Sequence, residues 1–432
     1  MIAPNNTVDR IFTISFRIRI RLTSVMDGVP YMESTPPGLR LGNLLASFSL
    51  ALDLQENRQL MHHRRTAYIA VRIGEILGIG DESLQNLFYG AMLHDIGNTE
   101  CSGSTDFNPS DYWEHPVRGA DLICSLPYLQ PAGDLIRNHH ERIDGQGFPR
   151  GLSETEIPIG SQVIAVADAL EQTLSFSDRV GSAGAQVLME QRLDLGAGTE
   201  FALELRDAAK SLFKITSFWL DLEEQNIGRV INRLVVRFDQ KITGSDLNQI
   251  GEVFAQLIDG KSAYTANHSK EVANYSARIG QAMGLAEGKI LQLYTAGLLH
   301  DLGKLGVPNA ILNKPGPLNW DEMEVIKAHP YYTEMILRDI QGLEDVAAWA
   351  AMHHEKINGS GYHSACQGGE IPLEARIIAV GDAYQAMIAD RPYRKGLPPE
   401  QAFGLLDEGI RCGYWDGAVV GTLKNLYLTM SL

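Results

Sequence analysis

The stretch AMLHDIG at residues 91–97 returns as GLLHDLGK at residues 297–304, at the centre of a repeat that decides the fold. The surrounding segments follow in the same order in both halves of the chain. The first half reads HHRRTAYIAVRIGEILGI (62–79), YWEHPVRGADLI (112–123), NHHERIDGQGFP (138–149) and EIPIGSQVIAVADA (156–169). The second half reads NHSKEVANYSARIGQAMGL (267–285), IKAHPYYTEMIL (326–337), MHHEKINGSGYH (352–363) and EIPLEARIIAVGDA (370–383). Such self-similarity indicates an internal duplication.

The separations between the polar residues of the repeat are the same in the two copies. They are 32 positions for His62 to His94 and His268 to His300, 24 for His115 to His139 and His329 to His353, and 29 for His139 to Asp168 and His353 to Asp382. Only the stretch from the HD pair to the next histidine differs, with 21 positions against 29. The second copy therefore has eight extra residues, around PNAILNKPGPL.

Between these segments the apolar residues recur at helical spacing. Steps of three and four residues connect Leu41, Leu44, Leu45, Phe48 and Leu52 in the first copy, and Leu247, Ile250, Phe254 and Ile258 in the second. The pattern predicts an all-α protein with two tandem bundles of six or seven helices each, at 39–215 and 243–432. The span 216–242 contains FWLDLEEQNIGRVINRLVVRF and is predicted to be a helical connector that holds the bundles in a fixed relation.

Residues 1–38 differ from the rest of the chain. Positions 12–23 alternate strictly between apolar and polar side chains, which predicts a short β-like segment. An edge strand, a flexible leader and an upstream extension of a protein that starts near Met26 or Met32 all fit this stretch. Three arginines within it argue against a secretory signal. Pro36, Pro37 and Gly38 separate it from the first bundle.

Composition excludes several classes of protein. With 53 acidic and 37 basic side chains the formal net charge is −16, which disfavours binding to DNA or RNA polymers. The four cysteines form no CxxC pair, so neither a disulfide scaffold nor a thiolate zinc site is expected. No apolar run is long enough to cross a bilayer. We therefore expect a cytoplasmic protein without a membrane partner.

The second copy carries seven side chains that are typical metal ligands. They are His268, His300, Asp301, His329, His353, His354 and Asp382, and they come from separate predicted helices. A lone histidine of this kind is usually a core residue, but joint recurrence at matched spacing favours a metal site. Imidazole and carboxylate ligands without thiolate suit iron or manganese, with zinc and nickel as alternatives. Seven donors suit two divalent ions, about 3.5–4 Å apart and bridged by a carboxylate and a hydroxide.

The adjacent pair His300 and Asp301 fits such a centre. Neighbouring side chains on a helix point about 100° apart, so the histidine can bind one ion while the aspartate bridges to the other. Two such ions activate water and stabilise in-line displacement at phosphorus, which predicts a phosphoester hydrolase. Lys304 follows three residues after Asp301 and is either a group that stabilises charge on the phosphate or a solvated lysine.

With these residues in view, the second copy resembles the HD-GYP family of HD-superfamily phosphodiesterases, which cleave cyclic di-GMP in bacterial signalling. The matching stretches are HDLGK, NKPG, AHP, HHEKINGSGY, EIPLEARIIAVGDAY and DRPYR, and they cover most of residues 243–432. The resemblance implies that the seven residues named above bind the metals. It also implies that Lys304, Lys314, Arg391 and Arg394 lie near the phosphates, and that Tyr362 belongs to the loop named after the GYP triplet.

The second copy departs from the family pattern at three places. The triplet reads Gly361, Tyr362 and His363, with histidine in place of proline, and Asn358 stands where aspartate is usual. Some members bind a third metal through a glutamate four residues before the first histidine, but this position is Tyr264. We therefore expect two metals rather than three.

The first copy resembles an HD domain of the same lineage more loosely. It keeps a second set of candidate metal ligands, His62, His94, Asp95, His115, His139, His140 and Asp168. Asn98 replaces Lys304, and the shorter loop removes the equivalent of Lys314. The first copy is therefore either a regulatory relic with residual metal or a second hydrolytic site. As a hydrolytic site it would remove the 5'-phosphate from the linear product of the C-terminal site.

The expected substrate is cyclic di-GMP or 3',3'-cyclic GMP-AMP, and the breadth of the family favours the former. The expected reaction is attack of a metal-bridging hydroxide, which yields a linear 5'-phosphorylated dinucleotide. Two other classes compete with this hypothesis. One is a non-catalytic module that binds a cyclic dinucleotide or a signalling protein, and the other is a different HD-superfamily nucleotide phosphohydrolase. A homodimer is a further candidate assembly.

Overall fold

The protein is described here from a computed structural model, which defines residues 38–55, 61–98, 109–175, 180–261, 267–390 and 395–430. Within these ranges the chain is helical, and it forms isolated β-bridges but no strand. The prediction of an all-α protein is therefore confirmed. The β-like stretch 12–23 lies outside the described residues.

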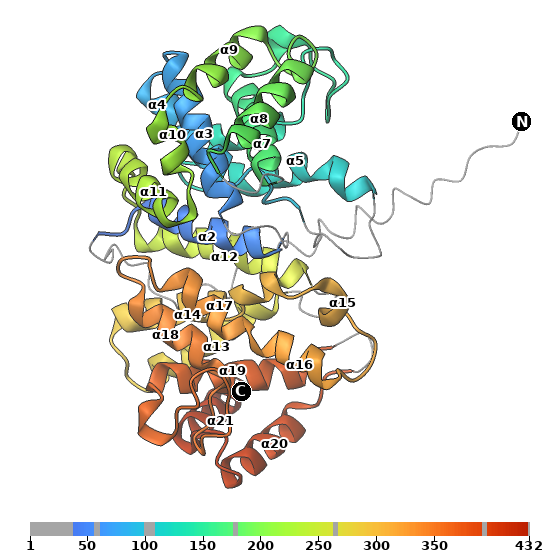
Figure 1. Ribbon diagram of the computed structural model, residues 1–432. Helices are drawn as coiled ribbons and strands as arrows, with labels where there is room; N and C mark the ends of the chain where they lie inside the picture. Colours follow the sequence, from blue (N-terminus) through green and yellow to red (C-terminus); the bar gives the residue numbers. More distant parts are fainter. Residues whose placement is uncertain are drawn as a thin grey trace, which may run out of the picture.

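The first repeat builds the upper bundle in Figure 1. Its α-helices are α2 (Leu41–Gln55), α3 (His62–Ile76), α4 (Asp81–Met92), α5 (Pro109–Cys124), α6 (Gln130–Arg137), α7 (Ile159–Ser175), α8 (Ala183–Gly196) and α9 (Leu203–Leu212). A short 3-10 helix, η2 (Glu154–Glu156), precedes α7. The span 216–242 then contains α10 (Thr216–Asp221) and α11 (Glu224–Phe238), and α11 packs against α2 and α3.

The second repeat builds the lower bundle in Figure 1. Its α-helices are α12 (Gly244–Gly260), α13 (His268–Ala282), α14 (Glu287–Leu299), α15 (Asn309–Leu312), α16 (Trp320–Lys327), α17 (His329–Leu337), α18 (Glu344–Ala351), α19 (Leu373–Ile388), α20 (Pro399–Arg411) and α21 (Gly417–Met430). The 3-10 helices are η3 (Leu302–Gly306), η4 (Met352–His354) and η5 (Gly368–Glu370).

Both bundles contain more helices than the six or seven expected. In the described part of the second repeat, the eight extra residues form α15 and its flanks, and the segment equivalent to α5 is divided into α16 and α17. Asn319 begins α16 with a capping box to Glu322, which defines a separate start for this helix. The predicted boundaries of the two units and the connector stay predictions.

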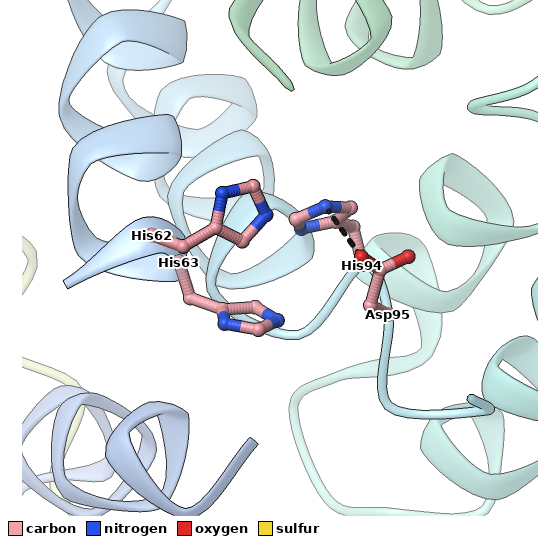
Figure 2. A group of neighbouring side chains, drawn as sticks. All are labelled: His62, His63, His94 and Asp95. Atoms are coloured by element: carbon pink, nitrogen blue, oxygen red, sulfur yellow. Dashed lines mark ion pairs between the residues drawn. The ribbon is translucent and has the colours of Figure 1, made fainter. Parts of the chain in front are cut away.

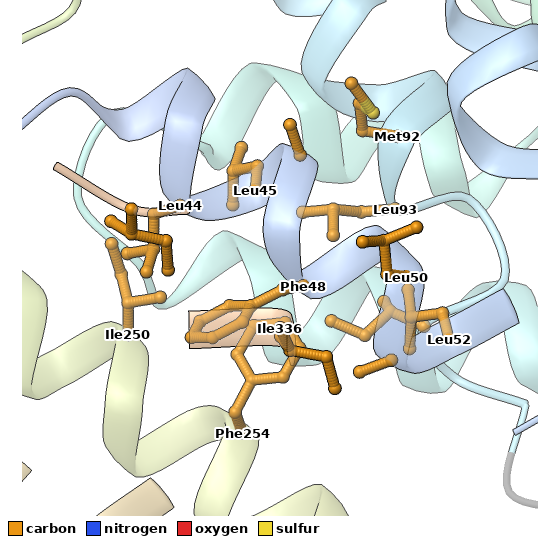
Figure 3. Packing of buried hydrophobic residues seen from close by; sticks show 14 of the residues in the cluster. Leu44, Leu45, Phe48, Leu50, Leu52, Met92, Leu93, Ile250, Phe254 and Ile336 are labelled. Carbon is orange, nitrogen blue, oxygen red and sulfur yellow. The ribbon is translucent and has the colours of Figure 1, made fainter. Parts of the chain in front are cut away.

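The two bundles meet along α2 and α12 (Figure 1). Helix α2 packs on α3 and α4 of its own unit and on η3 and α17 of the other. The rings of Phe48 and Phe254 lie 3.9 Å apart between their centroids, at equivalent positions of the two repeats. Figure 3 shows these rings between leucines of α2 and Ile250 and Ile336 of the second unit. One continuous apolar core therefore runs through both bundles.

The apolar stripes predicted from the sequence form part of this core. Leu44, Leu45 and Phe48 are fully buried on α2, and Ile250 and Phe254 are fully buried on α12. Their assignment as core residues is confirmed. No described helix is both long enough and apolar enough to cross a lipid bilayer.

Candidate metal centre

The predicted ligands of the second repeat come from the ends of four helices and from the interior of a fifth. His268 is the first residue of α13, His300 follows α14, His329 begins α17, and His353 and His354 lie in η4. Asp301 directly follows His300, and Asp382 projects from α19. All seven side chains are buried or nearly buried. The structure therefore brings together every metal ligand predicted for this copy.

A glycine in the HD turn permits this convergence. A Cβ atom at Gly303 would lie 2.0 Å from the backbone oxygen of His329, and one at Gly97 would lie 2.1 Å from that of His115. No larger residue fits there without a shift of the backbone. The HD turn can thus pack directly on the helix that supplies the next histidine.

Three imidazoles of the centre are held in one orientation by backbone carbonyls. The Nδ1 atoms of His300, His329 and His353 lie 2.8, 2.7 and 2.6 Å from the carbonyl oxygens of Gly297, Ile326 and Ala350. A carbonyl can only accept a hydrogen bond, so Nδ1 carries the proton and Nε2 keeps a lone pair. This is the usual arrangement around metal-binding histidines.

The Nε2 atoms surround the carboxylate of Asp301 on two sides. Asp301 Oδ2 lies 3.3 Å from His300 Nε2 and 3.6 Å from His268 Nε2. Asp301 Oδ1 lies 3.3 Å from His329 Nε2 and 3.7 Å from His353 Nε2. Each oxygen therefore faces its own pair of imidazoles, as expected of a carboxylate that bridges two ions.

On each side of Asp301, two donor atoms lie at a distance that would allow both to bind one metal ion. His329 Nε2 and His353 Nε2 are 3.4 Å apart, and His268 Nε2 is 3.4 Å from Asp382 Oδ1. Two nitrogens bound to one ion at about 2.1 Å lie about 3.0–3.4 Å apart. The buried Asp301 Oδ1 makes no hydrogen bond with described residues. The donor set therefore fits divalent metals bound by nitrogen and oxygen.

The pKa values of most of these groups favour the protonation states that metals require. The exception is His300: burial would lower its pKa, but the adjacent Asp301 raises it. Burial lowers the pKa of His329, lowers that of His353 well below its ordinary value, and lowers that of His354 to about 3. Burial would raise the pKa of Asp301, but His300 and Lys304 hold it well below its ordinary value. Neutral imidazoles and an ionised carboxylate are the forms that bind metals.

The predicted substrate residues occupy different places. Lys304 forms an ion pair with Asp301, with 2.5 Å between Nζ and Oδ2. The Tyr362 ring lies on His354, with centroids 4.8 Å apart. Lys314 Nζ instead pairs with Glu322 Oε2 at 2.6 Å. Arg391, Arg394 and Tyr264 lie outside the described residues.

The unusual histidine of the loop triplet has a partner of its own. His363 has a φ of 97°, and its Nε2 lies 2.8 Å from Glu334 Oε2 on α17. Asn358 Oδ1 accepts hydrogen bonds from the backbone and hydroxyl of Ser360. These contacts anchor the loop in the absence of the family's proline and aspartate.

The first repeat has the same arrangement around Asp95. Asp95 Oδ2 lies 3.2 Å from His94 Nε2, and Asp95 Oδ1 lies 3.2 Å from His115 Nε2 and 3.8 Å from His139 Nε2. His62 Nε2 is 3.5 Å from Asp168 Oδ1. His140 belongs to the same ligand group as Asp95, His115 and His139. All seven ligands predicted for this copy are thus close together.

Sequence reasoning missed the residues behind the first histidine of each copy. His62 Nδ1 is hydrogen-bonded to Glu171, whereas His268 Nδ1 lies 2.6 Å from Gln385 Oε1. It also missed His63, which faces the cluster beside His62 (Figure 2). The Nδ1 atom of His63 lies 2.6 Å from Asp53 Oδ1. The two adjacent histidines at positions 62 and 63 were a signal in the sequence from which His63 could have been predicted.

Comparison with known proteins also finds two matched units in this chain. The family model described as "HD domain" matches residues 47–185 and again residues 252–419. The 3'3'-cGAMP-specific phosphodiesterase 3 of Vibrio cholerae is 28% identical over 86% of this chain and 91% of its own length. The 3'3'-cGAMP-specific phosphodiesterase 1 of the same organism is 29% identical over 85% of this chain and 88% of its own length.

One further relative and one solved structure are also similar to this chain. A cyclic di-GMP phosphodiesterase of Thermotoga maritima is 36% identical over 36% of this chain and 43% of its own length. A crystal structure of a cyclic GMP-AMP-specific phosphodiesterase of V. cholerae covers 90% of this chain and 97% of its own length, with a TM-score of 0.68 and 26% identity. With both repeats matched by the family model, this chain belongs to the HD domain family.

Proposed function

We propose that the C-terminal centre hydrolyses one phosphodiester bond of a cyclic dinucleotide and releases a linear dinucleotide with a 5'-phosphate. The observation that carries this proposal is the position of Asp301, whose two carboxylate oxygens face two separate pairs of imidazoles. This arrangement supports a pair of divalent cations, for which we propose iron or manganese. The relatives that match both repeats are named as phosphodiesterases of this class.

The chemistry follows from the groups around Asp301. Two bound cations lower the pKa of water and stabilise charge on a phosphoryl group. In the reaction, the oxygen of water bonds to phosphorus, the bond from phosphorus to the 3'-oxygen breaks, and that oxygen leaves with a proton as a hydroxyl. The chain itself holds the donors in place, since the backbone carbonyls orient the imidazoles and Asp301 lies between them.

Two other side chains have positions suited to the substrate. The side chain of Lys304 is 26% exposed and touches Asp301, so its ammonium can reach a nonbridging phosphate oxygen of a substrate bound at the centre. The ring of Tyr362 lies over His354, another predicted ligand of the centre. We assign Lys304 to the phosphate and Tyr362 to contact with the nucleotide.

Among cyclic dinucleotides we place 3'3'-cGAMP first. Two of the V. cholerae relatives named for this substrate match 86% and 85% of the chain and a third matches 46%, whereas the T. maritima cyclic di-GMP phosphodiesterase matches 36%. The likeness to cGAMP-specific proteins therefore extends over both units. Because such messengers act inside bacteria, the proposal also places the protein in the bacterial cytoplasm.

The test is an anaerobic preparation of the full chain, loaded with iron or with manganese and supplied with each cyclic dinucleotide. Chromatography should show a linear dinucleotide, with faster turnover of 3'3'-cGAMP. Metal analysis should show about two ions in the C-terminal centre. A loaded protein that cleaves neither compound would rule out the proposed function.

For the N-terminal unit we propose the second of the two roles raised by the sequence, a phosphohydrolase that acts on the linear product. The observation that favours it is an aromatic surface beside the ligands, formed by the exposed Tyr112 and Trp113 of α5 together with the half-buried Phe148. Phe148 also stacks on His140, with centroids 4.7 Å apart. Such a surface suits a nucleobase, and no lysine occupies the place of Lys304.

The assay supplies the linear dinucleotide and measures released phosphate for His94→Ala and His300→Ala variants. We expect His300→Ala to release phosphate as the parent does and His94→Ala to release none. If neither the parent nor His300→Ala releases phosphate, the N-terminal unit is not this hydrolase and a regulatory role gains support.

A further inference from the structure

The two repeats differ by one fully buried imidazole beside their metal ligands. His63 follows His62 in the first repeat, and Ser269 occupies the equivalent place after His268 in the second. His63 has no exposed surface. Figure 2 shows its ring extending from the start of α3 toward the same space as His62, His94 and Asp95. One ligand atom from each of these four residues lies within 4.8 Å of the others.

The hydrogen bonds of His63 leave one nitrogen available to a metal. Asp53 Oδ1 lies 2.6 Å from His63 Nδ1 and also accepts the backbone N–H of His63 at 3.2 Å. With the proton on Nδ1, Nε2 carries a lone pair. This Nε2 is buried and has no hydrogen-bond partner among the described residues. Leaving a buried polar atom unpaired is unfavourable, whereas a metal ion would satisfy it.

A purely structural role for His63 fits less well, because the second repeat performs that role without an imidazole. There Asp259, the equivalent of Asp53, accepts hydrogen bonds from the backbone of Ser269 at 3.1 Å and from its hydroxyl at 2.8 Å. A small hydroxyl is therefore enough to hold this aspartate at the start of the helix. The larger ring of His63 adds a donor atom to the cluster.

A second carboxylate, that of Glu171, also favours metal binding by the first repeat. His62 Nδ1 is hydrogen-bonded to the buried Glu171, while its counterpart in the second repeat is bonded to the neutral amide of Gln385. A carboxylate behind a histidine makes the imidazole a stronger metal ligand. Both adjacent histidines of the first repeat thus have carboxylate support.

We propose that the N-terminal unit binds a divalent transition metal through His62, His63, His94 and Asp95, with His63 as a direct ligand that the C-terminal centre lacks. Three imidazoles and one carboxylate suit zinc, iron, nickel or cobalt better than magnesium or calcium. The site is thus nitrogen-rich on this side of Asp95. Occupancy of this site by a metal can be measured without catalytic turnover.

The test uses Co²⁺ as the probe, added to the full metal-free chain in which His300→Ala and Asp301→Ala disable the C-terminal centre. Bound ions are counted by equilibrium dialysis, and visible absorption reports the ligands. Adding His63→Ser should weaken Co²⁺ binding by at least about tenfold and change the absorption spectrum. Unchanged affinity and an unchanged spectrum would overturn the proposal.

The design contains its own control for folding. His63→Ser reproduces the pair that Ser269 and Asp259 form in the second repeat, so the variant should fold, as circular dichroism would show. Should it not fold, anomalous scattering from crystals of the unmodified chain with Zn²⁺ decides the matter. An ion about 2.1 Å from His63 Nε2 supports the proposal. An ion held by His62 and His94 that leaves His63 unbound refutes it.

Discussion

Replacing Asp301 by asparagine tests the bridging role that the geometry gives this residue. The change keeps the shape of the side chain and removes its charge. Asp301 and Asp382 are the two carboxylates among the seven ligands of the C-terminal centre, so the substitution removes half of the anionic charge available to two cations. The amide also leaves one of the two imidazole pairs facing an NH₂ group, which cannot bind a metal.

The expected effect on turnover is large. Bridged metals contribute several kcal/mol to the stabilisation of a phosphoryl transition state. A loss of about 4 kcal/mol corresponds to a rate reduced by about 10³-fold, since each 1.36 kcal/mol is worth a factor of about ten. We therefore expect kcat/KM for the cyclic dinucleotide to fall by at least that factor, with about two fewer bound ions in each chain.

The assay compares Asp301→Asn with Asp95→Asn, the same change at the equivalent position of the first repeat. Product chromatography measures cleavage of the cyclic dinucleotide, and mass spectrometry counts the metal ions. Asp95→Asn should lose metal from the N-terminal unit and keep the cleavage rate. Activity of Asp301→Asn within tenfold of the parent, at unchanged metal content, would refute the bridging role.

Three further outcomes are expected. Lys304→Ala should lower kcat/KM by about 10²-fold while the metal is retained, and simultaneous loss of metal would contradict its assignment to the phosphate. Gly303→Ala should disrupt the centre and lower solubility, because the new Cβ would meet the His329 carbonyl at 2.0 Å, whereas Gly369→Ala, which meets no atom within 4 Å, should behave as the parent. Burial raises the pKa of Tyr89 to about 12, above the value of about 10 in an unfolded chain, so stability should fall as the pH rises from about 10 to 12. Urea unfolding across this range should show a shallower fall for Tyr89→Phe.

The sequence predicted the fold and the grouping of ligands for the same physical reason. A duplicated pattern with matched separations brings equivalent histidines to equivalent places around the HD pair, as with His115 and His329, whose Nε2 atoms lie 3.2 Å from Asp95 Oδ1 and 3.3 Å from Asp301 Oδ1. The apolar stripes of α2 and α12 were equally readable, because helical periodicity marks a buried face. One copy could therefore be checked against the other.

The contacts that tune the centres could not be predicted. The hydrogen bonds of His300, His329 and His353 go to backbone carbonyls three residues earlier, which any sequence supplies. The pairing of Lys314 with Glu322 depends on how the loop before α16 folds. The direction of the His63 ring depends on Asp53, nine residues before the first ligand. Contacts of these kinds do not produce a periodic pattern in the sequence, so they could not be predicted from it.

The pairing of Phe48 with Phe254 bears on the history of the molecule. Equivalent residues of two copies meet each other where a two-fold axis relates the copies, as in an isologous dimer. A contact between equivalent residues is typical of an isologous homodimer interface, and here it lies within a single polypeptide. In a dimer of identical subunits, each mutation alters both active centres at once. Within one polypeptide each half can vary alone, which allows Asn98 and His63 in the first repeat where the second has Lys304 and Ser269.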